Sequence, residues 1–389
     1  MKRFVYADNA ATTRLSPQAL DKMMPYLTQR YGNPSSLYAF GQEAREGVTA
    51  ARESIAENLG CRPDEVFITS GGSEADNWAL KMVARQQAGK GKKHIISTQF
   101  EHHAVLHSLN ALEKDGFEIT LLPVYENGLI RLDDLRRAIR PDTALVSVMF
   151  ANNETGTVFP IQKIAEMVKE RGILFRTDAV PAAGTLPIDL AKMPVDFLAL
   201  SGHKLHAPKG IGVLYVRKGT RFIPFLRGGH QERGRRAGTE NAPYIVGLGA
   251  ACELAMNHMT DENTRVPALR DKLEKGLLAA IPDAIVNGDV ENRLPNTSNI
   301  AFQYVEGEAI LLLMDQLGIC ASSGSACTSG SLEPSHVLRA MGVPFTFAHG
   351  SIRFSLSRYT TDTEIDYVLE NLPPIIEQLR AISPFRAMK

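Results

Sequence analysis

Short β-branched runs alternate with helical patterns through the middle of this 389-residue chain, and this alternation limits the possible folds more than any other feature. Strands are predicted over 65–70, 94–97, 118–122, 144–149, 172–179, 195–200 and 212–216. Helices are predicted over 73–88, 101–115 and 161–171. Because strands that alternate with helices form crossover units, we expect an α/β fold with a mostly parallel sheet. Such a sheet binds ligands at the carboxyl ends of its strands.

The pattern changes after about residue 260, where helical segments outnumber strands. Helices are predicted over 266–281, 308–317 and 362–379, and strands over 299–302 and 351–356. This arrangement is typical of a smaller α+β domain. We place its boundary with the first domain near 255–265, in the polar stretch 260–264.

Composition and charge exclude several classes of protein. Lys+Arg number 43 and Asp+Glu number 43, and this balance argues against a protein that coats nucleic acid or an anionic membrane. No apolar run approaches the ~18–20 residues of a membrane helix, and residues 1–13 lack the apolar core of a secretory signal. The 4 cysteines are too few for a disulfide framework. We therefore expect a reduced, cytoplasmic protein with no nucleic-acid or membrane partner.

A lysine and an aspartate follow consecutive predicted strands. Lys204 comes shortly after the apolar run 197–200, and Asp178 ends the run 173–178. Since parallel strands end at one edge of a sheet, the amine and the carboxylate are expected together there. Pyridoxal phosphate requires such a pair, a lysine for covalent attachment and a carboxylate that keeps the pyridine nitrogen protonated. The alternatives are a solvated loop lysine and a helix N-cap aspartate.

Two further groups are expected at the same edge. Residues 69–74 form a strand end, a glycine turn and a helix start, and backbone amides at such a junction cradle an anion. His102 and His103 open the next helix, where an imidazole can stack on a cofactor ring and move protons. Two surface histidines are the alternative. Their spacing with His107 matches no zinc motif and the chain has no Cys-x2-Cys pair, so no intrinsic metal site is expected.

Three other segments carry candidate reactive or binding groups. Cys327 lies among serine and glycine residues, where a thiol is accessible enough to act as a nucleophile, although an unreactive thiol remains the alternative. The other cysteines adjoin apolar or helical segments and are interpreted as packing residues. Arg353, within a predicted strand, is either a strand-face charge or a bidentate carboxylate clamp. The basic, glycine-rich segment 227–239 is interpreted as a loop that reaches a phosphate rather than as a nucleic-acid patch.

Several motifs together identify a family. They are 8–13 (DNAATT), 40–41 (FG), 101–105 (EHHAV), 151–156 (ANNETG), 201–204 (SGHK), 231–241, and 323–339 (SGSACTSGSLEPSHVLR). On these motifs, which extend over almost the whole chain, it resembles the cysteine desulfurases of the fold-type-I pyridoxal-phosphate enzymes, most closely their nitrogen-fixation NifS type. The resemblance implies an aminotransferase class V-like fold. It also implies a large cofactor-binding domain over 15–258 and a small domain made of 1–14 plus 259–389.

The same resemblance assigns residues to the cofactor pyridoxal 5'-phosphate. Lys204 would bind it covalently, Asp178 would pair with its pyridinium nitrogen, and His102 would stack on the ring and serve as acid–base. Asn153 would lie beside the ring. The phosphate would be bound by Gly72, Ser73, Ser201, His203 and, from the other subunit of a homodimer, Thr239.

The implied reaction is the removal of sulfur from L-cysteine, which gives L-alanine. Arg353, together with Asn153, would bind the substrate, and Cys327 would accept the sulfur as a persulfide. The sulfur would then pass to a scaffold protein that builds iron–sulfur clusters, as in nitrogenase maturation. Cys327 would also be the residue able to ligate such a cluster transiently.

The sequence departs from the family pattern at one position. Members of the family usually read Asp-Ala-x-Gln after the strand, and the glutamine donates a hydrogen bond to the cofactor's phenolate oxygen. Here the residues are Asp178-Ala179-Val180-Pro181, and proline has no side-chain donor. A weakly active variant is therefore one alternative. The others are a selenocysteine lyase, an aminotransferase, and a non-catalytic interaction protein that retains the fold.

Overall fold

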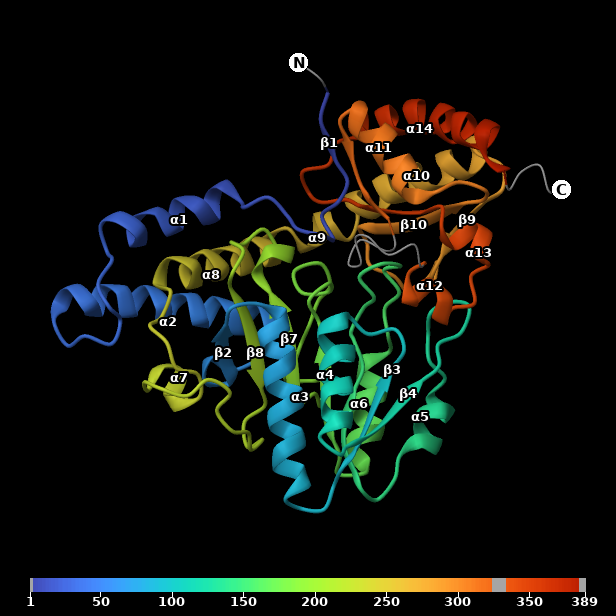
Figure 1. The fold of residues 1–389 in the computed structure, drawn as a ribbon. Helices are drawn as coiled ribbons and strands as arrows, with labels where there is room; N and C mark the ends of the chain where they lie inside the picture. Colours follow the sequence, from blue (N-terminus) through green and yellow to red (C-terminus); the bar gives the residue numbers. More distant parts are fainter. Residues whose placement is uncertain (1–2, 324–333, 385–389) are drawn as a thin grey trace.

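A seven-stranded sheet and a four-stranded sheet organise the computed structural model, which describes residues 3–323 and 334–384 (Figure 1). The large sheet has the order β2-β8-β7-β6-β5-β3-β4. Its strands are β2 (Val66–Thr69), β3 (His94–Thr98), β4 (Glu118–Leu122), β5 (Thr143–Ser147), β6 (Leu174–Asp178), β7 (Phe197–Ser201) and β8 (Gly212–Val216). Only the pairs that β8 forms with β7 and β2 are antiparallel. The predicted α/β fold with a mostly parallel sheet is confirmed.

Helices cover both faces of the large sheet, which explains why its strands are apolar on both sides. Successive residues of β7 enter opposite cores: Leu198 and Leu200 pack in one, and Phe197 and Ala199 in the other. The first core also receives side chains from α2 (Ala39–Leu59), α6 (Ile161–Glu170) and α8 (Ala242–Asn257). The second core receives them from α3 (Gly72–Ala88) and α4 (His103–Lys114).

Several helices of the large body were not assigned from the sequence. They are α1 (Pro17–Thr28), α2, α5 (Leu132–Ala138) and α8, with the short segments η1 (Pro63–Glu65), η2 (Gly202–Lys204) and α7 (Gln231–Gly234). The 3.6-residue pattern was present in α2, since its buried residues Ala44, Val48, Ala51, Ile55 and Leu59 recur at spacings of three and four. The helix ends at Gly60, whose backbone is left-handed (φ +60°).

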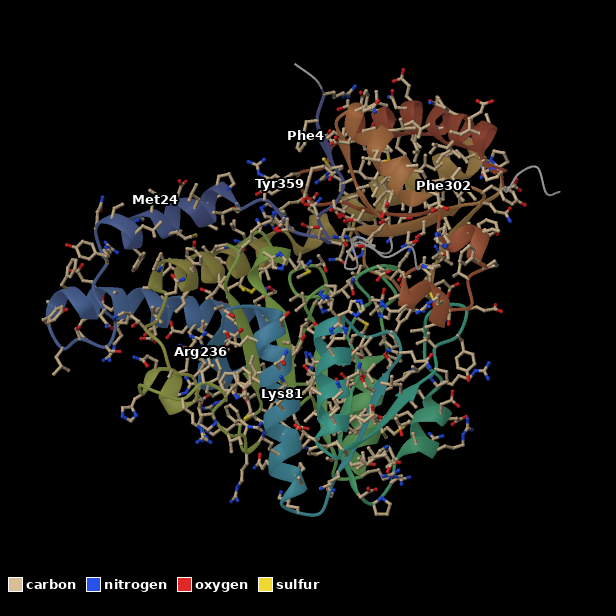
Figure 2. All side chains as sticks on the ribbon, in the orientation of Figure 1. Phe4, Met24, Lys81, Arg236, Phe302 and Tyr359 are labelled. Atoms are coloured by element: carbon tan, nitrogen blue, oxygen red, sulfur yellow. The ribbon has the colours of Figure 1, made fainter. Side chains whose placement is uncertain are left out.

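The smaller body packs helices on an antiparallel sheet of order β12-β13-β10-β9. The strands are β9 (Ala284–Asn287), β10 (Thr297–Phe302), β12 (Ser322–Ser323) and β13 (Ser351–Ser355). The helices of its core are α10 (Arg265–Ala280), α11 (Gly307–Gln316) and α14 (Asp362–Ile382). The short helices are α9 (Met259–Glu262), which precedes α10 in the chain, and α12 (His336–Ala340) and α13 (Phe345–Ala348), which precede β13. Val337 and Leu338 of α12 belong to the first core of the large sheet. Phe302 lies in the interior of this body (Figure 2).

The start of the chain packs with its end. β1 (Val5–Tyr6) pairs in parallel with β11 (Ile319–Cys320), and Val5 and Ala7 belong to the same core as α10, β10 and α14. The predicted domain limits at 14–15 and 258–259 stay a prediction. Within the described ranges, no helix is both long and apolar enough to cross a membrane.

Candidate active site

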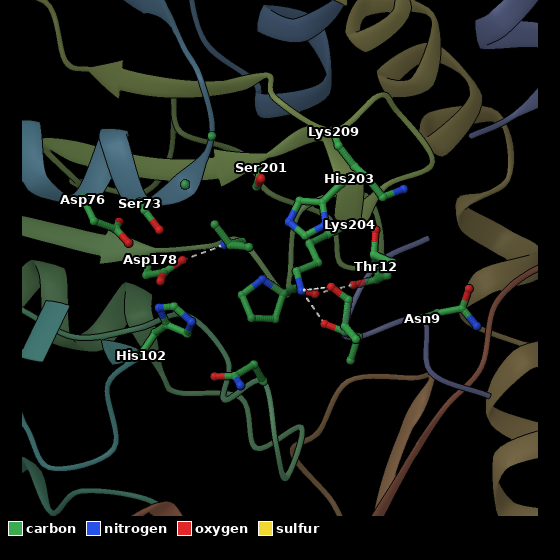
Figure 3. A pocket seen from close by; sticks show the side chains of 18 of the residues that line it. Asn9, Thr12, Ser73, Asp76, His102, Asp178, Ser201, His203, Lys204 and Lys209 are labelled. Carbon is green, nitrogen blue, oxygen red and sulfur yellow. Dashed lines mark hydrogen bonds between the residues drawn. The ribbon is translucent and has the colours of Figure 1, made fainter. Parts of the chain in front are cut away.

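A cavity of about 680 Å³ lies at the carboxyl ends of the central strands of the large sheet. Its walls come from the ends of β2, β6 and β7, from residues 9–12 near the start of the chain, and from Thr297 and Arg353 of the smaller body. In Figure 3, Asp178 and His102 lie on one side of this cavity and Lys204 lies on the other. The site is therefore formed jointly by the two bodies.

Lys204 and Asp178, predicted at one edge of the sheet, both line this cavity. Asp178 is the last residue of β6 and is 3% exposed, and its Oδ1 accepts a hydrogen bond from the Val180 amide at 2.9 Å. Lys204 ends η2, the turn that follows β7, and its Nζ donates to the backbone carbonyls of Ala10 and Ala11. The turn η2 and the N-terminal segment thus hold the amine at the cavity.

The start of α3 forms the predicted anion cradle. The first backbone amides of a helix have no acceptor within the helix, so at Gly72 and Ser73, which line the cavity, they are donors for a bound anion. A Cβ added to Gly72 would lie 2.7 Å from Cγ2 of Val180, so a side chain there would push the helix away from the residues that follow Asp178. Ser201 and His203 line the same cavity.

His102 is the N-cap of α4, and this contact determines its tautomer. Its Nδ1 accepts a hydrogen bond from the Ala104 amide at 3.1 Å, which leaves the proton of the neutral ring on Nε2. Burial lowers the pKa of His102, and the nearby Lys204 lowers it further, although Asp178 acts in the opposite direction. The ring is therefore neutral at pH 7 and presents the N–H of Nε2 as a hydrogen-bond donor.

Arg353 lies on β13 and is already paired in the cavity wall. Its Nη2 donates to Oδ1 of Asp8 at 2.9 Å, and its Nη1 donates to the carbonyl of Asn153 at 2.9 Å. The residue is 5% exposed, so its charge is largely removed from solvent. Its Nε is buried and has no hydrogen-bond acceptor among the described residues. The guanidinium is therefore positioned to bind an anion that enters the cavity.

Two buried carboxyl groups lie next to these residues and were not predicted. Burial, reinforced by the charge of Asp178, raises the pKa of Glu101 well above its usual range, and its Oε1 accepts the Met149 amide at 2.7 Å. Burial also raises the pKa of Glu154 to about 7, although a hydrogen bond from Ser335 and the charge of Arg353 oppose the shift. Glu101 follows β3 and Glu154 follows β5, and their position after strands of the parallel sheet was the available sequence signal.

A buried ion pair between Asp76 and Arg176 was also missed. Asp76, on α3, lines the cavity, and Arg176 lies on β6 two residues before Asp178. Side chains two residues apart on a strand point to the same face, so Arg176 lies below Asp178 on the α3 side of the sheet. An arginine directly after the apolar residues 173–175 of a predicted strand was the signal in the sequence.

The structure thus brings together most of the predicted site. The predicted residues that line the cavity are Gly72, Ser73, His102, Asn153, Asp178, Ser201, His203, Lys204 and Arg353. Pro181 lines it too, as does Thr185, whose hydroxyl donates to the carbonyls of Pro181 and Ala182. Thr239 is exposed and does not line the cavity of its own chain, and Cys327 lies outside the described residues.

These residues fit pyridoxal phosphate. The amine of Lys204 lies across the cavity from the carboxylate of Asp178, and the glycine-lined start of α3 offers amides to a phosphate. The described residues contain no group of three or more side chains able to hold a metal ion.

Comparison with known proteins agrees with this geometry. The family model of aminotransferase class-V matches residues 5–368. A cysteine desulfurase of Trichormus azollae is 57% identical over 382 residues, which cover 98% of this chain and 95% of the relative. The cysteine desulfurase NifS of Azotobacter vinelandii is 55% identical over 382 residues, with 98% and 94% covered. A solved structure named NifS-like protein superposes with a TM-score of 0.91 at 39% identity, covering 97% of this chain and 100% of that one.

Proposed function

The chain belongs to the cysteine desulfurases of the aminotransferase class-V family, which depend on pyridoxal phosphate, and we propose that it converts L-cysteine to L-alanine and a persulfide on Cys327. The observation that carries the proposal is the position of Lys204 opposite Asp178 in one cavity, with an anion cradle at the start of α3. The assignment of Cys327 rests on motif 323–339, because the residue lies outside the described ranges.

The side chains around the cavity have complementary tasks. Bound pyridoxal phosphate supplies an electron sink that stabilises negative charge at the substrate α-carbon. Asp178, the last residue of β6, keeps a proton on the ring nitrogen. The Lys204 amine, when it is not covalently attached to the cofactor, takes and returns the proton at the α-carbon. The neutral His102 offers the N–H of Nε2 as a hydrogen-bond donor.

Arg353 binds and orients the substrate. A carboxylate that enters the cavity meets its guanidinium, which Asp8 and the carbonyl of Asn153 hold in place. Asn153 itself lines the cavity beside it. This contact fixes one end of L-cysteine, so that its sulfur has a defined position relative to the bound cofactor.

The proposal extends to the protein's partners. The sulfur would pass to an iron–sulfur scaffold protein, and the NifS name of a relative supports a role in nitrogenase maturation. The protein would act as a homodimer in which Thr239 reaches the partner's phosphate, and the exposure of Thr239 in a single chain supports this arrangement. We also propose a reducing, cytoplasmic location, supported by the free thiols of Cys61, Cys252 and Cys320.

An absorbance spectrum with and without L-cysteine tests the main proposal. The protein loaded with pyridoxal phosphate should absorb in the visible, and L-cysteine should change the spectrum while alanine and sulfide form in equal amounts in the presence of a thiol reductant. Borohydride should attach the cofactor to the peptide that contains Lys204. Attachment at Lys209, which also lines the cavity, would contradict the assignment. Turnover of selenocysteine but not cysteine, or transamination alone, would favour the alternatives.

A further inference from the structure

A carboxylate lies beside the site that must accept a phosphate. Glu74 is in the first turn of α3, lines the cavity, and accepts the Ser70 amide on Oε2 at 2.8 Å. Burial opposes its ionisation, but hydrogen bonds from Arg236 and Ser70 outweigh this effect and lower the pKa of Glu74. The residue is therefore charged at neutral pH. An uncompensated negative charge at this position would repel a phosphate dianion bound at Gly72 and Ser73.

Arg236 compensates this charge. Its Nε donates to Oε1 of Glu74 at 2.9 Å and its Nη2 donates to Oε2 at 3.1 Å, which is the two-pronged geometry of a strong arginine–carboxylate pair. The side chains of Arg236 and Glu74 are 22% and 10% exposed, so solvent screens the pair only in part. Figure 2 shows Arg236 beside α3, on the side of α7.

The backbone that carries Arg236 is held in an unusual conformation. Glu232 and Arg233 both have left-handed backbones, with φ of 48° and 58°, which is costly for residues other than glycine. The buried Glu232 accepts two hydrogen bonds from Arg52, at 2.7 and 3.0 Å, and one from the Ile68 amide at 3.1 Å. These contacts fasten α7 to α2, which carries Arg52, and to β2, the strand that leads into α3. The position of Arg236 relative to the cradle is thus determined by the fold.

We propose that Arg236 is a positioning residue for the cofactor's phosphate: by neutralising Glu74, it allows the start of α3 to bind a dianion. The inference rests on the proposed function, since pyridoxal phosphate supplies the dianion. The alternative role for the Arg236–Glu74 pair is to tether the loop to the helix. Loss of either side chain would break a tether, and loss of both would be no better. Neutralisation of Glu74, by contrast, is no longer needed once Glu74 has lost its charge.

The test compares cofactor affinity in single and double variants. Arg236→Met should weaken the binding of pyridoxal phosphate about tenfold, the size expected for one uncompensated charge near a dianion. Adding Glu74→Gln to Arg236→Met should restore most of the affinity, since the amide still accepts the Ser70 bond and carries no charge. Arg236→Lys, which keeps the charge, should stay close to the wild type.

Two controls isolate the phosphate. Pyridoxal, which lacks the phosphate, should bind the wild type and Arg236→Met equally well. Arg235→Met should leave the affinity for pyridoxal phosphate unchanged, because Arg235 stacks on Phe222 and donates to its carbonyl at 2.9 Å instead of contacting Glu74. Circular dichroism of each variant verifies its fold.

The outcomes separate this inference from the proposed function. Unchanged affinity in Arg236→Met would overturn the inference, and so would equal weakening in the single and double variants, which would identify a tether. Equal losses for pyridoxal and pyridoxal phosphate would also overturn it. A wild type that binds no pyridoxal phosphate would overturn the proposed function and the inference together, whereas the other results leave the proposed function intact.

Discussion

Replacing Arg176 with methionine should destabilise the protein severely. Arg176 is fully buried on β6, forms an ion pair with Asp76 of α3, and donates from Nη1 to Oγ of Ser147 at 3.0 Å. Burial lowers its pKa to about 10, although Asp178 opposes the shift, so the guanidinium remains charged at neutral pH. Methionine fills a similar volume but leaves Asp76, which is 1% exposed, as a buried carboxylate without its cation.

The expected cost follows from this burial. Removal of one partner of a buried ion pair costs about 3–5 kcal/mol, because the other charge stays desolvated and uncompensated. Typical proteins have only about 5–15 kcal/mol of stability in total, so the loss is a large fraction of it. Replacing Asp76 as well, in Asp76→Leu/Arg176→Met, removes both charges and should recover most of the loss, since apolar replacements of buried pairs are often neutral or stabilising.

Urea unfolding of the apoprotein measures the effect. Trp78 is the only tryptophan, and it is fully buried on α3 near Asp76, so its fluorescence reports unfolding at the relevant helix. Arg140→Met is the matched control: Arg140 pairs with Asp142 and Glu118 at the surface, and its loss should hardly move the midpoint. An Arg176→Met midpoint equal to the wild type, or a double variant no more stable than the single one, would refute the reasoning.

Three further predictions concern the site. Cys327→Ala should still bind the cofactor and change its spectrum with L-cysteine, yet release no sulfide above background; normal sulfide release would mean that another group accepts the sulfur. Pro181→Gln should raise desulfuration or cofactor affinity by about ten- to a hundredfold, since a charge-assisted hydrogen bond is worth roughly 1.5–3 kcal/mol. No change would indicate that another donor already serves the phenolate. Burial raises the pKa of Glu154 to about 7, so the folded protein keeps the proton on this carboxyl group up to a higher pH than the unfolded chain does. The bound proton therefore stabilises the folded state at acidic pH, and this stabilisation is lost as the pH rises to 7. Glu154→Gln should therefore gain stability relative to the wild type between about pH 4.5 and 7, by about 2–3 kcal/mol, and a constant difference across that range would contradict the shift.

The sheet edge and its chemistry could be predicted because the signals are local. The strands around Asp178 and Lys204 are apolar runs that end in a polar residue, and parallel strands end at a common edge wherever they lie in the sheet. The glycine turn at 69–74 likewise indicates the start of a helix from its local sequence alone. Fold class, cofactor type and most residues of the cavity wall follow from such local patterns and from the family motifs.

The partners of each charge depend on the tertiary structure. Arg353 pairs with Asp8, 345 residues away, because β13 and the N-terminal segment meet at the cavity. Arg236 reaches Glu74 from the residues that follow α7, where Arg52 of α2 and the Ile68 amide of β2 hold the left-handed Glu232. The periodicity of apolar residues indicates which face of a helix or strand is buried. It does not indicate which charged residue from a distant part of the chain packs against a given charge. Sequence alone therefore determined the sheet edge and its reactive groups, whereas the packing of distant segments decided the charge balance around them, since electrostatic interactions depend on distance in space and not along the chain.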